Sequence, residues 1–201
     1  MYLAERCVIN MTERVEKFID RKIKKEKING QIYLMASPCS EHRQVQGNLS
    51  TILNDYFKKN KRKCRAIFDH DLYIDEDNTL EPDIKILCRE TRTDNIPVLV
   101  IEVLSKSTQD RDYSVKMKIY AEIGIREYWL IDWKDGTAAV YLLSENCYKH
   151  YKTYALYIPN DKELQNLDEY EKTYIETVKE FHPVSFPELV VKMDDIFDIF
   201  I

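Results

Sequence analysis

Two acidic residues stand out because each lies within or beside an apolar stretch. Glu102 lies inside the run Val98–Leu104, whose other residues are all apolar. Asp83 follows Pro82 and opens a second short apolar stretch. An ionised carboxylate in a sheet interior costs several kcal/mol unless a cation compensates its charge. We therefore expect a divalent metal ion, or a lysine from a neighbouring element, beside these carboxylates.

Two strands are expected to position this pair. Side chains alternate along a strand, so Glu102 projects from one face near the carboxyl end of the strand 98–104. Asp83 begins the strand 83–87, and the two carboxylates converge if these strands are antiparallel neighbours joined by residues 88–97. Two hard carboxylate oxygens a few ångströms apart suit Mg²⁺ or Mn²⁺. A water acidified by such a metal is a nucleophile for a phosphodiester.

A helix expected over residues 109–123 offers a positive group. Steps of four, four and three residues place one stripe of side chains on this helix: Asp112, Lys116, Tyr120 and Ile123. Lys118 lies about 200 degrees around the helix from Lys116 and faces away. An inward Lys116 can orient or deprotonate the attacking water, or stabilise the negative charge that develops on the phosphate.

Structural roles are open for the same residues. Glu102 could form an ion pair with Lys116 or Lys85 that only supports the fold. Asp83 taken alone is typical of a strand end after a proline. Tyr120 is most simply a core residue, although beside Lys116 it would limit the mobility of that lysine. The set together favours a site, because the order of elements is consistent with one core that contains all of these residues.

The remaining elements alternate along the chain. Apolar residues recur at three- and four-residue spacing over 41–59, which predicts a long amphipathic helix. Asp135-Gly136 predicts a hairpin turn between the last two strands. The expected helices span residues 11–26, 41–59, 109–123 and 162–179. The expected strands span residues 31–35, 66–74, 83–87, 98–104, 128–132 and 137–143. This order indicates an α/β fold.

Composition indicates an ordinary globular protein. The 201 residues are 44% hydrophobic and 32% charged, and no Pro-, Gly- or Ser-rich stretch divides them, so we expect one domain over residues 1–201. The longest apolar run is far shorter than the roughly 20 residues that cross a bilayer, and no signal peptide is recognised. We expect a cytoplasmic protein without a membrane segment. The five cysteines are an odd number and widely spread, which favours reduced thiols.

The net charge and its distribution are weak indicators of which partners the protein binds. The formal net charge of −5 argues against a chain that is basic overall, as many nucleic-acid-binding proteins are. Two local basic clusters remain, over residues 21–27 and 58–65. Such runs are more often solvated faces than phosphate contacts.

The central residues also carry a family resemblance. The motifs are Pro82-Asp83, Ile101 to Thr108 (IEVLSKST), Asp112, Lys116, Tyr120, Gly124 and Glu127 to Asp132 (EYWLID). This series closely resembles the Uma family of restriction-endonuclease-like proteins, a branch of the PD-(D/E)XK nuclease superfamily. The resemblance extends from about Gly30 to the Phe186-Pro187 region. It implies a central mixed β-sheet flanked by helices, a core over about residues 30–143 on which the terminal segments pack, and a metal-dependent nuclease site.

The resemblance assigns roles to the three residues already singled out. Asp83 and Glu102 match the metal carboxylates, and Lys116 matches the active-site lysine. In the superfamily the lysine usually stands two residues after the Glu, where this chain has Leu104. The Uma-like pattern takes it from the following helix, which agrees with the stripe that contains Lys116.

Other positions match the family in part. His42 matches a position near the start of the first long helix, with an accessory role near the active site. Lys106 stands where the family usually has proline, and is a second candidate cation. The family often has an acidic residue directly after Gly30, where this chain has Gln31.

These features predict a Mg²⁺- or Mn²⁺-dependent endonuclease that hydrolyses DNA. Asp83 and Glu102 would bind the metal, and Lys116 would position or activate the water. A homodimer is expected for cutting both strands. The alternative from another class is a nucleic-acid- or protein-binding module that keeps the fold without turnover and need not take up metal. Hydrolysis of another phosphate ester is a third alternative.

Overall fold

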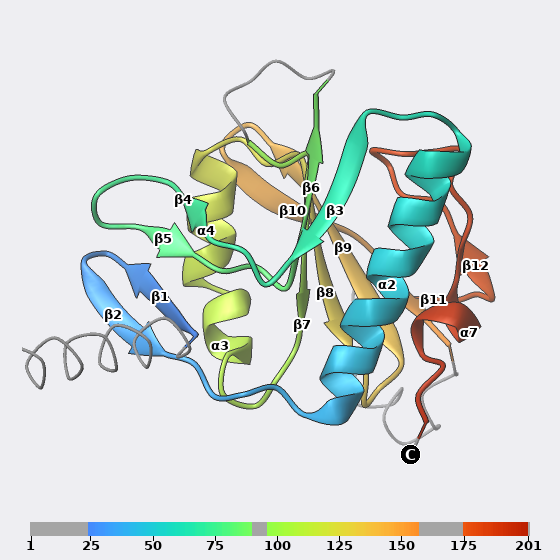
Figure 1. Ribbon diagram of the computed structural model, residues 1–201, viewed down its shortest axis with the longest axis horizontal. Coiled ribbons are helices and arrows are strands. Elements are labelled where there is room, and N and C mark those ends of the chain that lie inside the picture. The colour runs from blue at the N-terminus through green and yellow to red at the C-terminus, as the bar shows by residue number, and fades with distance from the viewer. Residues whose placement is uncertain (1–23, 90–95, 157–174, 201) are drawn as a thin grey trace, which may run out of the picture. The chain divides into compact units, whose positions relative to one another are not determined.

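The structure is a computed structural model that describes residues 24–89, 96–156 and 175–200 (Figure 1). Its contacts divide the chain into two compact units, one of residues 1–37 and 71–81, the other of residues 38–70 and 82–201. A single domain over all 201 residues stays a prediction. Among the described residues, no helix is both long and apolar enough to cross a membrane.

The smaller unit contains a four-stranded antiparallel sheet in the order β2-β1-β5-β4. Its strands are β1 (Lys25–Ile28), β2 (Gln31–Leu34), β4 (Leu72–Tyr73) and β5 (Thr79–Leu80). Asn29 and Gly30 join β1 to β2 with φ of 50° and 78°, which suits an Asn-Gly hairpin turn. The helix predicted over 11–26 is wrong at its end, because Lys25 already pairs with Leu34 across the hairpin. Residues 11–23 lie outside the described residues.

The larger unit is built on a seven-stranded sheet in the order β11-β10-β9-β8-β7-β6-β3. Its strands are β3 (Cys64–Phe68), β6 (Ile84–Cys88), β7 (Leu99–Val103), β8 (Glu127–Asp132), β9 (Thr137–Ser144), β10 (Cys147–Ala155) and β11 (Ile175–Thr177). The pairs β7·β8 and β10·β11 are parallel and the other pairs are antiparallel. The predicted mixed sheet flanked by helices is confirmed.

Register at the centre of the sheet decides where the carboxylates go. Strands β6 and β7 are antiparallel neighbours, and Ile84 faces Ile101. All five residues of β7 are buried, as expected for a strand covered on both faces. The start of β6 therefore lies beside the end of β7, which is the arrangement that convergence of Asp83 and Glu102 requires.

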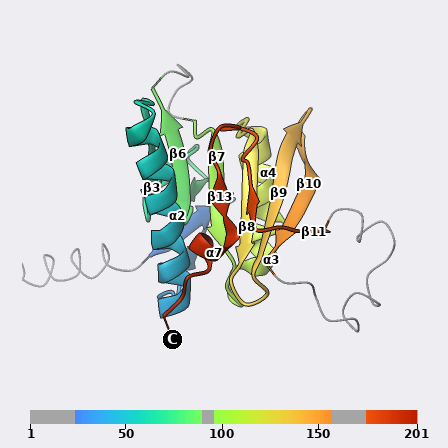
Figure 2. The same cartoon turned by 90° about the vertical axis from the view of Figure 1, so that its right-hand side faces the viewer.

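Helices cover both faces of this sheet. Figure 2 shows α2 (Ser40–Lys59) and α7 (Met193–Ile196) in front of it, and α3 (Gln109–Asp112) and α4 (Val115–Glu122) behind it. The apolar side of α2 packs in one core with the inward side chains of β6 and β7. That core includes Val45, Leu49, Leu53, Phe57, Ile84, Ile86, Leu99 and Ile101.

The helix predicted over 109–123 is present in two pieces. It is interrupted at Tyr113 and Ser114, where the Ser114 backbone has φ −129° and ψ −87°. The Ser114 hydroxyl donates a hydrogen bond to the Asp110 carbonyl, and such local bonds compete with the helix ladder. The predicted stripe survives the interruption, because Asp112 and Lys116 still meet across it.

Two other boundaries differ from those predicted. A single strand over 66–74 is wrong, because β3 ends at Phe68, Asp69 adopts φ 47°, and the chain enters β4 of the smaller unit. The helix predicted over 162–179 is wrong at its end, since Ile175–Thr177 pairs with β10, and residues 157–174 lie outside the described residues. The last described segment adds β12 (Glu180–Phe181) and β13 (Val191–Lys192).

The expectation of reduced thiols is wrong for two cysteines. Cys64 and Cys88 form a disulfide between β3 and β6, where the register pairs them directly. Cys39 and Cys147 are free and exposed, and Cys7 lies outside the described residues. The bonded cysteines are 24 positions apart, which hides the pairing from local sequence patterns.

Candidate active site

Asp83 and Glu102 meet at one end of the central strand pair. The backbone N–H of Asp83 donates to Glu102 Oε2 at 3.2 Å, and the N–H of Val103 donates to Asp83 Oδ2 at 2.8 Å. The two residues are 6% and 2% exposed. The structure thus brings both predicted carboxylates to one buried point, held by the backbones of β6 and β7.

The predicted lysine and tyrosine reach the same carboxylate from α4. Lys116 Nζ lies 3.2 Å from Glu102 Oε1, and the Tyr120 hydroxyl donates to that oxygen at 2.8 Å. Both side chains are buried behind the sheet. Glu102 therefore accepts hydrogen bonds from a lysine, a tyrosine and a backbone N–H, which hold its orientation.

Asp112 is a member of the site that sequence reasoning left without a role. Its Oδ1 lies 3.0 Å from Lys116 Nζ, so the lysine stands between two carboxylates. Burial raises the pKa of Asp112, and the charge of Lys116 opposes that rise. Its place on the same helical stripe as Lys116 was a signal that could have identified it. The Tyr128 hydroxyl donates to the Asp112 carbonyl at 3.1 Å, which fixes the end of α3.

Two side chains of α2 support Asp83 from the other direction. His42 Nε2 lies 3.1 Å from Asp83 Oδ2, which agrees with the accessory position expected for His42. Gln46 donates through Nε2 to the Asp83 carbonyl at 2.8 Å and to Asp69 Oδ1 at 3.1 Å. Sequence reasoning missed Gln46, although its spacing of four residues from His42 places both on one helical face.

The two other candidate lysines lie elsewhere. Lys106 is exposed in the turn after β7 and is not part of this hydrogen-bonded set of described residues. Lys85 is buried, and its Nζ lies 3.1 Å from His70 Nδ1. Lys116 is therefore the lysine that the structure places against Glu102 and Asp112.

The charges of the site suit a small divalent cation. Three carboxylates, of Asp83, Glu102 and Asp112, are buried here, and Lys116 lies between two of them. The described residues contain no group of three or more His, Cys, Asp or Glu side chains arranged to hold a metal ion. Mg²⁺ commonly takes one or two protein carboxylates and completes its shell with waters and substrate oxygens. The two hard oxygen donors of Asp83 and Glu102 fit that pattern.

Comparison with known proteins decides the family. Residues 12–170 match the model of the Uma2 family, which is described as "Putative restriction endonuclease". The chain belongs to the Uma2 family. The resemblance to this family that the sequence motifs carry is thereby confirmed.

Two individual proteins are similar to this Uma2 chain. An uncharacterized protein of Synechocystis sp. is 31% identical over 116 residues, which cover 54% of this chain and 60% of the relative. The match therefore spans less than two thirds of that relative. A crystal structure from Anabaena variabilis, described as a "putative nuclease belonging to DUF820", is 21% identical with a TM-score of 0.65. It covers 88% of this chain and 91% of its own, and shows that the fold is shared.

Proposed function

We propose that this Uma2 protein is an endonuclease that hydrolyses DNA phosphodiester bonds with Mg²⁺ or Mn²⁺. The observation that carries the proposal is the buried pair Asp83 and Glu102 with Lys116 against one of them. Membership of a family described as restriction endonucleases supports the reaction class. Burial of the Asp83 and Glu102 carboxylates at one point supports the need for a metal.

Each side chain has a definable task in this reaction. Asp83 and Glu102 would hold the metal ion, which when bound supplies an acidified water and offsets phosphate charge. Lys116 donates to the attacking water or to a phosphate oxygen, where it stabilises the developing negative charge. Tyr120 fixes Glu102 through Oε1, and Asp112 keeps the Lys116 ammonium in place.

His42 and Gln46 contact Asp83, the other carboxylate of the proposed metal site. His42 contacts Asp83 Oδ2, and Gln46 contacts the Asp83 carbonyl, so two side chains of α2 set the position of one metal carboxylate. Because α2 is anchored in the core by Val45 and Leu49, this support is rigid. His42 and Gln46 are positioning residues in this proposal.

One observation favours a binding module without turnover as the second candidate. Both oxygens of Glu102 already accept hydrogen bonds from the chain, and Asp83 Oδ2 contacts Val103 and His42. A network satisfied in this way could serve the fold alone. Metal affinity separates the candidates, since a module that only binds need not take up Mn²⁺ through these carboxylates.

The test is cleavage of supercoiled and linear DNA in Mg²⁺ or Mn²⁺. Asp83→Asn and Glu102→Gln keep side-chain shape and remove the charge, and each is prepared identically to the native protein. Glu122→Gln is the matched control, because it removes an exposed carboxylate at the end of α4. Metal-dependent cleavage lost in the first two variants and kept in the control supports the nuclease. Cleavage equal in all four proteins would identify a contaminant and reject this site.

A homodimer on DNA completes the proposal, because cutting both strands takes two active sites. The products of supercoiled DNA report on this directly. Linear product formed without accumulation of nicked circles indicates paired active sites acting together. Accumulation of nicked circles alone indicates a protein that acts as a monomer.

A further inference from the structure

A hollow lies at the end of the sheet opposite the carboxylates of Asp83 and Glu102. Asp83 precedes β6 and Cys88 ends it, while Glu102 lies near the end of β7 and Val98 precedes it. The hollow is about 350 Å³ in volume, and it contains Cys88 and Val98 among its lining residues. It is therefore separated from the active site by the length of the strands.

A smaller basic hollow adjoins it. This hollow measures about 280 Å³, and four of its five lining residues are cationic: Arg62, Lys63, Arg65 and Arg89. The fifth, Cys64, and Arg62 line both hollows, so the two spaces meet there. Among the described residues, Arg62 is the member of these four with an ion-pair partner, the exposed Glu188 at 3.6 Å. Four cations around a space of this size favour a compact polyanion such as a phosphate.

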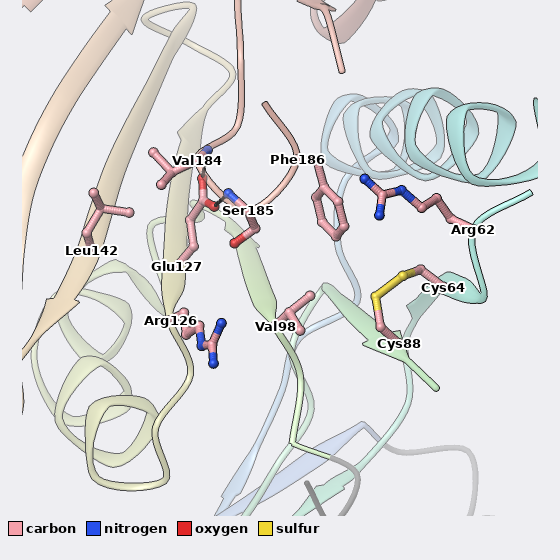
Figure 3. Close-up of a pocket in the computed structure, with 10 residues that line it drawn as sticks. All are labelled: Arg62, Cys64, Cys88, Val98, Arg126, Glu127, Leu142, Val184, Ser185 and Phe186. Carbon is pink, nitrogen blue, oxygen red and sulfur yellow. Dashed lines mark hydrogen bonds between the residues drawn. A yellow bond between two sulfur atoms is a disulfide. The ribbon is translucent and has the colours of Figure 1, made fainter. Parts of the chain in front are cut away.

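The larger hollow has a different lining. Its walls include Val98, Leu142 and Phe186, and Arg126 and Ser185 add polar groups. Figure 3 shows the Arg62 side chain extending above the Cys64–Cys88 bond toward the side on which Phe186 lies. Apolar walls with a few polar groups are typical of sites for a ring-bearing small molecule.

Glu127 also lines this hollow, but its carboxylate is engaged by the chain. It accepts from the N–H groups of Val184 and Ser185 at 3.2 and 2.6 Å, and from Trp129 Nε1 at 2.8 Å. Three donors disperse its negative charge within the protein. The charge that a ligand meets in the two hollows is therefore set by the arginines and Lys63.

We propose that these two adjoining hollows form a nucleoside-phosphate site, with the phosphate between Arg62, Arg65 and Arg89 and the base in the space beside Phe186. A free nucleotide and the 5′-phosphorylated end of a DNA strand present this same chemistry. The site is independent of the proposed nuclease centre, because it shares none of its residues and needs no metal. Its ligand is held by guanidinium–phosphate hydrogen bonds and by burial of one face of the base.

Titration calorimetry in EDTA tests the proposal, since without metal the catalytic carboxylates repel phosphate. The ligands are dAMP, deoxyadenosine, inorganic phosphate and a 5′-phosphorylated single-stranded oligonucleotide. We expect dAMP to bind saturably and more tightly than deoxyadenosine or inorganic phosphate. The oligonucleotide arm separates the sources: tighter binding than dAMP indicates a strand end, and weaker binding a free nucleotide.

Single-charge variants locate the binding. Arg65→Gln and Arg89→Gln, both at exposed positions, should each weaken dAMP binding about tenfold or more. Lys118→Gln is the matched control, because it removes an exposed positive charge on α4 from a residue that lines neither hollow, and it should leave affinity unchanged. Arg126→Gln should weaken dAMP binding without affecting that of inorganic phosphate.

The contrary results are equally definite. Absence of binding by dAMP and the oligonucleotide overturns the site, as does affinity that Arg65→Gln and Arg89→Gln leave intact. Equal affinity for dAMP and inorganic phosphate overturns the placement of the base beside Phe186. Because the exposed arginines do not support the core, matching thermal unfolding of each variant and the native protein shows that a lost signal is not lost folding.

Discussion

Lys116 and Asp112 form an ion pair across the interruption between α3 and α4, with 3.0 Å between Nζ and Oδ1 and both side chains 2% exposed. The same ammonium lies 3.2 Å from Glu102 Oε1. Lys116 therefore lies between two buried carboxylates, and removing either carboxylate would leave its ammonium with fewer buried partners. The position of Lys116 in the candidate site and the stability of the fold therefore both depend on the ion pair with Asp112.

Asp112→Ala should destabilise the fold by about 3–5 kcal/mol, because removing one partner of a buried ion pair leaves the other charge buried without compensation. Asp112→Asn should cost less, because the amide oxygen keeps a polar atom beside the Lys116 ammonium. The free energy of unfolding in urea measures both. Equal costs for the two variants would show that the charge of Asp112 is required, and not only a polar atom at its position.

Lys116→Met should lower DNA cleavage by about a hundredfold to ten-thousandfold while leaving Mn²⁺ binding in place. Methionine retains the buried apolar stem of Lys116 and removes the ammonium. Glu102→Gln should lose both cleavage and metal binding. Cleavage and Mn²⁺ titration of each variant are compared with Lys118→Met, which alters an exposed lysine of the same helix. Full activity of Lys116→Met would reject the proposed role of this lysine.

Tyr120→Phe should reduce cleavage less than Lys116→Met does. The variant removes only the hydroxyl that donates to Glu102 Oε1 at 2.8 Å, so the carboxylate loses orientation but keeps its charge. Hydrogen bonds to charged groups contribute about 1.5–3 kcal/mol. Single-turnover cleavage rates measured over a range of Mn²⁺ concentrations separate a weaker metal site from a slower reaction. A rate equal to that of the native protein at every concentration would argue against the positioning role.

Stability should fall at alkaline pH because of Tyr128. Burial, with the nearby carboxylates of Glu102 and Asp112, raises the pKa of Tyr128 well above its usual value. The folded state therefore holds this proton more tightly than the unfolded state does. The contribution of the protonated Tyr128 hydroxyl to the free energy of unfolding is complete below about pH 10, which is the pKa of tyrosine in the unfolded chain. It is lost progressively as the pH rises above that value.

Urea unfolding at several alkaline pH values measures this loss. Tyr128→Phe should flatten the decline, because phenylalanine carries no ionisable group. Burial also raises the pKa of Tyr141 to about 12, so part of the decline remains in the variant. An unchanged slope in Tyr128→Phe would assign the whole effect to other tyrosines.

Reduction of the Cys64–Cys88 bond should lower the free energy of unfolding by about 2–4 kcal/mol. The bond closes a loop that includes β3, β4, β5 and β6, and cleaving it gives the unfolded chain more freedom. Urea midpoints with and without reductant measure the effect. The double variant Cys64→Ser, Cys88→Ser should show no response to reductant, and a response in it would point to another disulfide.

Local sequence patterns were sufficient to predict which residues of the candidate site share a face of a strand or a helix. Alternation along residues 98–104 places Glu102 on one face, and steps of four residues place Asp112, Lys116 and Tyr120 on one stripe. These relationships depend only on the repeat of a strand or a helix. They hold even though the helix is broken at Ser114, because the stripe needs only that Asp112 and Lys116 remain one turn apart.

The tertiary structure alone decided the relationships between distant segments. The pairing of β6 with β7 sets Asp83 against Glu102, and that of β3 with β6 sets Cys64 against Cys88. Gln46 reaches Asp83 only because α2 packs on the sheet beside it. Lys25 and Ile175 lie in strands although nearby charged residues favour helix, because hydrogen bonds to partner strands outweigh a weak local propensity. Such pairings depend on which strands become neighbours, and no short sequence window contains that choice.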